Sequence, residues 1–304
     1  MEDVDHNKIP SWYGEIFPAG ENDGWYHKFG EHAASFVERD TAQLVISFDN
    51  LSDAGYPYPD IEPWAGKFVR ENGWSHLGIY ARGPSWFRDP RLIAFLEQLE
   101  RTGFFRGFEK IALIGTSMGG FAALTFSSLC PGATVVALSP QSTLQSDLVP
   151  WETRFGKGRD RDWSLPFSDA ASQLNGLGKA YVLYDPFFAP DKRHVMRLPQ
   201  QKLIHLQGFG FGHKSAVVLR RLGLLKPFMQ GAISGELQPS EFYKWIRKRR
   251  ELYVYRIVME THLSTRGKDD RIARFRRAFR TNRRKSQLSA AAVDEQSAKL
   301  PGER

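Results

Sequence analysis

The chain has 304 residues, of which 41% are hydrophobic and 25% charged, and it carries a formal net charge of +8 and a single cysteine, Cys130. This composition is typical of a globular protein with a sizeable core. One cysteine excludes an internal disulfide, and no run of 18 apolar residues predicts a membrane span. Residues 1–5 are acidic and lack the apolar segment of a secretory signal, so we expect a cytoplasmic protein.

The first hundred residues predict strands that alternate with helices. Residues 1–35 are rich in aromatics without a clean period, and we expect them to pack over an edge of the sheet or over the mouth of the site. A hairpin around Arg39-Asp40 is expected to lead into a strand at 43–48. A strand at 75–80 and a helix at 90–105 follow.

The most informative segment is Gly115-Thr116-Ser117-Met118-Gly119-Gly120. It follows a short apolar strand at 111–114 and precedes a helix at 121–129. A serine on so tight a turn is pushed forward in a strained conformation, and the flanking glycines avoid a collision between β-carbons. This context predicts a nucleophile elbow at Ser117, whereas the bare pattern also fits an ordinary turn serine.

Beyond a strand at 134–138, the chain leaves the strand pattern over residues 139–178, which we interpret as a small cap over the site. Trp151 and Trp163 could line a cleft, although plain packing is the more common role of such aromatics. Three arginines of this insertion could bind an anionic substrate, but a solvated surface is favoured; they are Arg154, Arg159 and Arg161.

Two later strands end in residues with acid–base chemistry. Asp185 ends the strand at 179–184, at the carboxyl edge where such a sheet assembles its site. It could merely cap the next segment, and Asp191, six residues on, is the alternative acid. A strand at 201–207 leads through a glycine-rich loop to His213, which we prefer over the competing histidines His194 and His205. We interpret His205, inside the strand, as a core or edge histidine.

This alternation predicts an α/β fold with a mostly parallel sheet covered by helices on both faces. The serine, the acid and the histidine follow one another in this order, each after its own strand, and in this the chain resembles the α/β-hydrolase family. The resemblance covers about residues 43–228 and is to bacterial members of the family. It implies that Ser117 is the nucleophile, His213 the general base and Asp185 the group that orients the imidazole.

The same resemblance implies an oxyanion hole with one donor from the backbone N–H of Met118. The second donor should come from the loop after the strand at 43–48, where Asn50 is our candidate, and a plain turn-forming Asn is the alternative. The His-Gly-Gly-Gly sequence of many lipases is absent from the chain, and so is any His-Glu-x-x-His or paired-cysteine spacing. We therefore expect no metal and no cofactor.

The C-terminal part is basic: residues 241–285 contain 16 Lys and Arg against 5 Asp and Glu. We predict a hydrolase domain at 1–235, a basic extension of amphipathic helices at 236–285 and a disordered tail at 286–304. Such an extension can dock on the domain or touch an acidic surface; nucleic acid is not expected, since no recognised module is present. All three predicted catalytic residues precede 214, so we expect chemistry and basic charge to be separable.

These features together predict a serine hydrolase that cleaves a carboxylic ester, or an amide, of a small molecule through an acyl-serine intermediate. An acyltransferase that uses the same residues is the close alternative. A non-catalytic scaffold that binds an acidic partner or membrane surface through the basic helices is the third interpretation.

Overall fold

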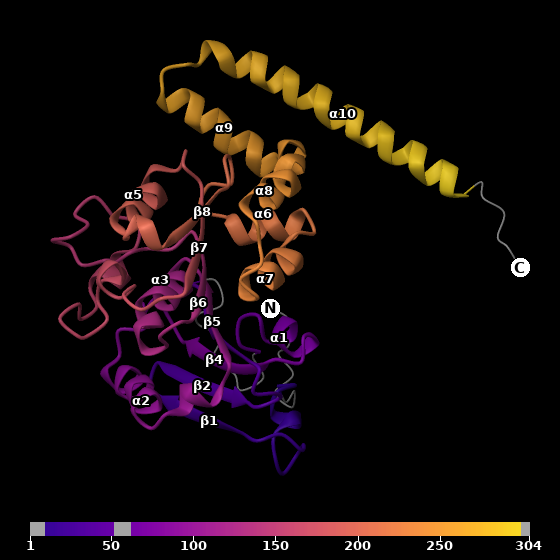
Figure 1. Cartoon of the computed structure of the whole chain (residues 1–304). Coiled ribbons are helices and arrows are strands. Elements are labelled where there is room, and N and C mark those ends of the chain that lie inside the picture. Colours follow the sequence, from indigo (N-terminus) through magenta and orange to yellow (C-terminus); the bar gives the residue numbers. More distant parts are fainter. Residues whose placement is uncertain (1–9, 52–61, 299–304) are drawn as a thin grey trace, which may run out of the picture.

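The computed structural model describes residues 10–51 and 62–298, with side chains described as far as residue 284. An eight-stranded sheet occupies the centre, with the spatial order β1-β2-β4-β3-β5-β6-β7-β8 (Figure 1). Its strands are β1 Gly24–Phe29, β2 His32–Val37, β3 Gln43–Phe48, β4 Ser75–Ala81, β5 Lys110–Thr116, β6 Thr134–Leu138, β7 Lys179–Tyr184 and β8 Leu203–Gln207. The strands from β4 to β8 pair in parallel, and β1 and β2 extend the sheet antiparallel.

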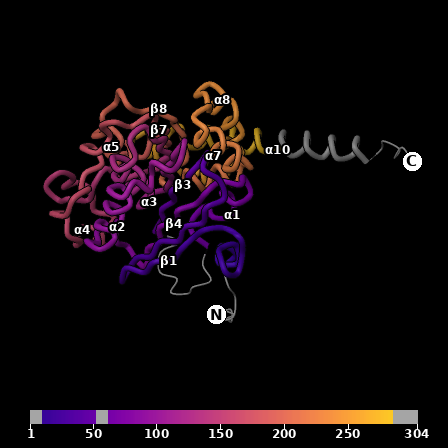
Figure 2. The backbone as a smooth tube through the Cα atoms, turned by 60° about the horizontal axis from the view of Figure 1, so that its bottom comes forward, coloured from indigo at the N-terminus to yellow at the C-terminus, as the bar shows by residue number. Residues whose placement is uncertain are grey.

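Helices cover both faces of this sheet (Figures 1 and 2). One face carries α2 Pro90–Arg101, α3 Met118–Thr125 and α5 Ala189–Arg197. The other carries α1 Gly66–Glu71, α6 Ser215–Arg221, α7 Leu225–Ile233 and α8 Pro239–Trp245. The predicted α/β-hydrolase-like fold is therefore confirmed.

Strand β3 illustrates why the sheet has two apolar faces. Leu44, Ile46 and Phe48 point to the core beneath α2 and α3, whereas Val45 points to the core beneath α1 and α6. Successive side chains of a strand point to opposite faces, so a strand buried on both sides has a continuous apolar sequence. This is the pattern from which the strand was predicted.

Helix α2 begins where its sequence predicts. Asp89 accepts a hydrogen bond from the Arg91 backbone N–H, and Pro90 occupies the first helical position. The helix ends at Arg101, and Gly103 with φ 85° leads into η2 Phe104–Gly107. The predicted helix at 90–105 is thus an α-helix followed by a short 3-10 turn.

The predicted hairpin around Arg39-Asp40 is wrong. Strand β4 lies between β2 and β3, so these two strands do not pair with each other. The backbone N–H groups of Arg39 and Asp40 both donate to Ser75 Oγ, at 2.9 and 3.1 Å, which ties this link to the start of β4. The antiparallel hairpin is instead β1–β2, which the aromatic sequence of residues 1–35 does not reveal.

The insertion at 139–178 contains α4 Gly156–Arg159 and η4 Ala170–Ser172. Arg88 fastens it to the body by donating hydrogen bonds to four of its carbonyls, those of Asp162, Leu165, Pro166 and Phe167. Trp163 is buried and meets Phe121 of α3 edge-on, so it packs in the core rather than lining a cleft.

The C-terminal segment comprises α8, η6 Ile246–Glu251, α9 Tyr253–Thr265 and α10 Asp270–Ala298. Phe242 and Ile246 are buried in the same core as α6 and α7, so the predicted domain boundary at residue 235 falls inside a packed unit. Helix α10 continues as far as Ala298 into the segment for which disorder was predicted, and it passes there through Ala290-Ala291-Ala292, whose residues have the highest helix propensity. Residues 299–304 lie outside the described part of the chain.

Candidate functional site

Ser117 lies on the tight turn between β5 and α3 with φ 52° and ψ −114°, a conformation that L-residues rarely adopt. A β-carbon on Gly115 would lie 2.2 Å from the backbone of Gly119, and one on Gly119 would lie 2.4 Å from the carbonyl oxygen of Phe48. The two glycines therefore permit the turn for the steric reason that the sequence indicated. A hydrogen bond of 2.9 Å from the Ser117 N–H to the Leu138 carbonyl holds the turn against β6.

Three side chains form a hydrogen-bonded chain at the carboxyl edge of the sheet. Ser117 Oγ lies 2.9 Å from His213 Nε2, and His213 Nδ1 lies 2.8 and 2.9 Å from the two carboxylate oxygens of Asp191. A carboxylate only accepts, so Nδ1 carries the proton and Nε2 is left to accept the serine hydroxyl. The tautomer that a general base requires is thus set by Asp191.

Asp185 does not take the predicted position beside the imidazole. Its side chain is buried and accepts hydrogen bonds from the backbone N–H groups of Phe187, Gly210 and Gly212, at 2.9, 3.1 and 2.7 Å. Burial raises the pKa of Asp185, against the effect of these three donors. Asp185 therefore holds the glycine-rich loop that carries His213, and the acid that meets the imidazole is the alternative, Asp191.

Asp191 reaches this position from the first turn of α5. Pro190 stands next to it at the helix start, a sequence signal that places Asp191 on a helix near the strand end. A helix N-terminus also favours a carboxylate, because the N–H groups of the first turn face it.

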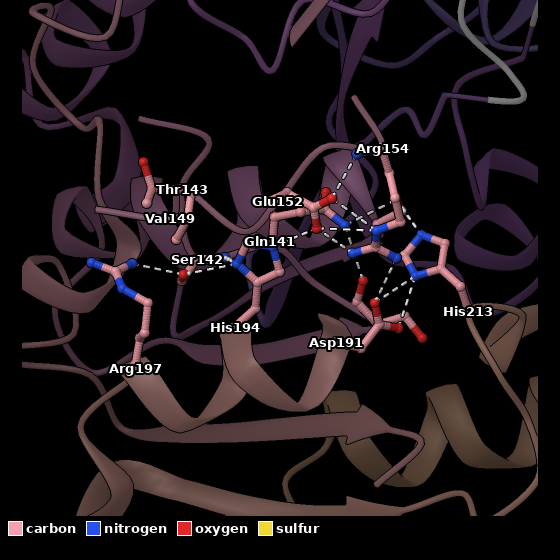
Figure 3. Close-up of polar contacts among 12 residues, drawn as sticks. Gln141, Ser142, Thr143, Val149, Glu152, Arg154, Asp191, His194, Arg197 and His213 are labelled. Atoms are coloured by element: carbon pink, nitrogen blue, oxygen red, sulfur yellow. Dashed lines mark hydrogen bonds and ion pairs between the residues drawn. The ribbon is translucent and has the colours of Figure 1, made fainter. Parts of the chain in front are cut away.

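Asp191 belongs to a buried network that continues away from His213 (Figure 3). Arg154 donates to Asp191 Oδ1 at 3.1 Å and to both oxygens of Glu152, and His194 Nε2 lies 3.0 Å from Glu152 Oε2. Burial opposes ionisation of Glu152, but the hydrogen bonds from His194 and Arg154 outweigh it and lower the pKa of Glu152 to about 2. Arg154 is therefore a half-buried cation between two carboxylates, not the solvated residue that was predicted.

His194 is held as a neutral imidazole by this network. The backbone N–H of Ser142 donates to its Nδ1 at 3.1 Å, so the ring proton is on Nε2 and points at Glu152. Burial lowers the pKa of His194. Its ring lies on the far side of Glu152 and Arg154 from Asp191 (Figure 3), so His213 alone of the two contacts Ser117.

Sequence reasoning missed Gln141, which is fully buried just after β6. Its Nε2 lies 3.3 Å from Ser117 Oγ, and its Oε1 accepts a 3.1 Å hydrogen bond from Trp86 Nε1. The tryptophan fixes the amide so that its donor faces the serine, which leaves the serine hydroxyl proton for His213. The position of Gln141, in the loop that follows a predicted strand end at residue 138, is the signal that could have found it.

The two residues predicted for an oxyanion hole both lie near Ser117. Met118 is buried at the first position of α3, where a backbone N–H has no partner within its own helix. Asn50 is buried after β3 and lines the same cavity as Ser117.

Ser117 and His213 open into a large cavity of about 1310 Å³. Its apolar lining comes from loops after the strands and from α6 and α9; it includes Trp64, Phe155, Phe187, Phe188, Phe211, Val217, Val254, Ile257 and Val258. Phe155 is the one residue of the insertion at 139–178 that lines the cavity within the part of the chain that the structure describes. Trp151 packs on His194 instead.

Helix α9 forms one wall of this cavity and contacts the loop that carries His213. His262 stacks on Phe187 with ring centroids 3.9 Å apart, and a β-carbon on Gly210 would lie 2.3 Å from the Tyr255 ring. Arg249 of η6 donates to the Phe209 carbonyl of the same loop at 2.9 Å. Helices α9 and η6 of the C-terminal segment therefore border the candidate site, and the expected separation of chemistry from basic charge stays a prediction for truncated chains to test.

The other two arginines of the insertion are also engaged. Arg159 donates to the carbonyls of Val149 and Glu152, and Arg161 pairs with Glu31 at 2.8 Å. Within residues 10–51 and 62–298, no cluster of three or more His, Cys, Asp and Glu side chains could hold a metal ion. None of the helices in those ranges has the length and apolar character needed to cross a membrane.

No protein-family model matches the chain, and no curated protein matches it either. Among solved structures, the chain is similar to the capsule O-acetyltransferase of Neisseria meningitidis serogroup A, with 12% identity, a TM-score of 0.46 and coverage of 69% of this chain and 94% of that one. It is also similar to the fluorophosphonate-binding serine hydrolase F of Staphylococcus aureus, with 12% identity, a TM-score of 0.44 and coverage of 72% and 98%.

A bacterial heroin esterase shares 16% identity, with a TM-score of 0.45 and coverage of 75% of this chain and 84% of that one.

Proposed function

We propose that this protein is a serine hydrolase that cleaves a carboxylic ester of a small molecule through an acyl-serine intermediate. The observation that carries the proposal is the hydrogen-bonded chain from Ser117 Oγ through His213 to Asp191, which begins on a strained turn and opens into a large apolar cavity. A nucleophile, a base within hydrogen-bond reach and a group that orients the base are the parts that covalent acyl transfer requires.

In the first half-reaction, Ser117 Oγ attacks the ester carbonyl carbon while its proton passes to His213 Nε2. Asp191 stabilises the imidazolium through the proton on Nδ1 and stays ionised. The tetrahedral intermediate collapses when its C–O bond to the alcohol breaks, and the alcohol leaves with the proton from Nε2. In the second half-reaction, water loses a proton to Nε2 and attacks the acyl carbon, which releases the acid and restores Ser117.

We propose that the negative charge on the intermediate is stabilised by the N–H of Met118, with Asn50 as the second donor. The first backbone N–H groups of a helix are without intrahelical partners, so the start of α3 favours an anion there. Asn50 supports the assignment by lining the cavity next to Ser117.

The test is labelling with a fluorophosphonate, which reacts with an activated serine. The full-length protein should be labelled at Ser117, and Ser117→Ala should lose labelling and almost all esterase activity, roughly a million-fold in kcat by the precedent of serine proteases. Circular dichroism of the variant checks that it is folded. Labelling that persists in Ser117→Ala at another serine would refute the assignment, and a wild-type protein that is not labelled would favour the scaffold.

An alcohol can replace water in the second half-reaction, so an acyltransferase uses the same residues. The fold is compatible with either outcome. Product analysis decides between them: a transferase forms a new ester in preference to the free acid when an alcohol acceptor is added at millimolar concentration.

A further inference from the structure

The cavity beyond Ser117 combines an apolar wall with a group of cations. Helix α9 contributes Val254, Ile257 and Val258 to the wall, and Ile257 is 58% exposed there. An exposed isoleucine at a cavity mouth loses its contact with water when a chain packs on it, which favours an apolar ligand. The volume of about 1310 Å³ exceeds the roughly 300–1,000 Å³ of most small-molecule sites.

Three cations line the same cavity: Lys214, Arg220 and Arg221. All three side chains are exposed, and none of them has a hydrogen bond or an ion pair within the part of the chain that the structure describes. Arg154, Arg159 and Arg197, by contrast, are each bound to carboxylates or carbonyls. The cations of the cavity are therefore available to an anionic ligand.

The spacing along α6 places these charges at a distance from the reacting groups. Helix α6 begins at Ser215, two residues after His213, and a rise of about 1.5 Å per residue puts the backbone of Arg220 roughly 8 Å further along the helix. Ala216, Val217, Arg220 and Arg221 share the side of α6 that faces the cavity. A ligand with its ester at Ser117 can thus present an anion several bonds away from the carbonyl.

We propose that the substrate is an ester that joins a long apolar chain to an anionic group of the phosphate type, with the chain on the wall formed by α9 and the anion at Arg220 and Arg221. This inference rests on the proposed function and specifies its substrate class.

The test compares four esters of glycerol that differ in two features only. They are 1-acetylglycerol and 1-octanoylglycerol, each with and without a 3-phosphate, assayed with the full-length protein below the concentration at which the octanoyl compounds aggregate. Burial of six additional methylenes should raise kcat/KM at least about 100-fold, even if only part of the chain is buried. The phosphate should raise it about tenfold further, and this gain should shrink as salt rises.

Two pairs of variants separate a ligand contact from a general effect of charge or surface. Arg220→Gln/Arg221→Gln should remove the preference for phosphate, so that kcat/KM for the phosphorylated and unphosphorylated octanoyl esters becomes equal within about twofold in this variant. The matched control Arg271→Gln/Arg274→Gln removes two exposed arginines from α10 that do not line the cavity, and it should leave the preference for phosphate unchanged. Ile257→Gln should lower the preference for octanoyl over acetyl several-fold, whereas Leu148→Gln, an exposed leucine elsewhere, should not.

Equal kcat/KM for the phosphorylated and unphosphorylated esters, or a phosphate preference that survives Arg220→Gln/Arg221→Gln, would overturn the anionic part of the inference. Equal kcat/KM for the acetyl and octanoyl esters, or a preference for acetyl, would overturn the apolar part. If either part fails but the protein still hydrolyses these esters and is labelled at Ser117, the proposed function is still supported. Absence of labelling and of turnover with every ester would instead remove the proposed function, and the inference with it.

Discussion

Two aspartates near His213 have different partners, and the partners predict different consequences of mutation. Asp191→Asn should lower kcat about ten-thousandfold, because the amide N–H group can donate to Nδ1 and so favours the tautomer in which Nε2 carries the proton and cannot accept from Ser117. Asp185→Asn should act on stability, by about 1–3 kcal/mol, because an amide accepts less well from the three N–H groups of the loop. Esterase kinetics and urea unfolding of both variants check this.

The reverse ranking, with Asp185→Asn the more damaging to kcat in a protein of unchanged stability, would return the acid to Asp185. The contact distances predict otherwise, since both carboxylate oxygens of Asp191 lie within 3 Å of Nδ1.

Arg154 links Asp191 to Glu152, so we expect it to position the acid without touching the substrate. Arg154→Gln should lower kcat by about 10- to 100-fold with little change in KM, since a charged hydrogen bond to a buried carboxylate contributes about 1.5–3 kcal/mol. Arg159→Gln is the matched control, because Arg159 lies in the same insertion but donates to the carbonyls of Val149 and Glu152. Equal effects of the two substitutions on kcat would show that the loss is structural.

Strand β4 carries a buried histidine that makes stability depend on pH. His76 accepts or donates a 2.8 Å hydrogen bond with Ser47 Oγ, and burial lowers its pKa to about 3. The unfolded chain binds a proton at this residue below about pH 6.5, whereas the folded protein does so only near pH 3. Between these values the unfolded state holds more protons, so stability falls as the pH falls.

The size of this effect can be measured in urea at pH 7 and pH 4. His76 alone should lower the free energy of unfolding by about 3 kcal/mol between these values. The His76→Gln variant has no titrating group at this position. Its free energy of unfolding should therefore fall by about 3 kcal/mol less than that of the wild type between pH 7 and pH 4. Identical losses in the wild type and the variant would mean that His76 is protonated in the fold.

The C-terminal segment has two structural roles in the molecule, one in the core and one at the cavity. Phe242 and Ile246 complete the core under α6 and α7, whereas α9 lines the cavity and contacts the loop of His213 through Tyr255. A chain that ends after Gly235 should aggregate, because it loses two fully buried side chains that contribute several kcal/mol. A chain that ends after Leu252 keeps them, so it should fold but lose most of its activity on long-chain esters.

Size-exclusion chromatography and kcat/KM for octanoyl and acetyl esters of both truncated chains test this division. Full activity after truncation at Gly235 would restore the separation of chemistry from basic charge that the sequence suggested. Soluble protein without activity after truncation at Leu252 would support the role of α9 as a wall of the site.

Local features of the sequence determined much of this architecture. The apolar segments at 43–48, 134–138 and 179–184 coincide with β3, β6 and β7, because burial on both faces of a sheet requires continuous apolar residues. Gly115 and Gly119 identified the turn at Ser117, because a tight turn excludes β-carbons over a few residues. His213 was found because it follows a strand end and a glycine-rich loop.

Tertiary packing decided what depends on residues far apart in the chain. Strand β4 lies between β2 and β3, although the sequence predicted that these two consecutive strands pair with each other. Arg154 contacts Asp191, which is 37 positions away in the sequence. Asp185 accepts hydrogen bonds from backbone N–H groups of the loops, so Asp191 is the carboxylate that contacts His213. Gln141 and α9 border the site because of contacts with residues that are distant in the sequence. Periodicity and turn residues act over a few positions, whereas the partner of a buried charge is set by the whole fold that surrounds it.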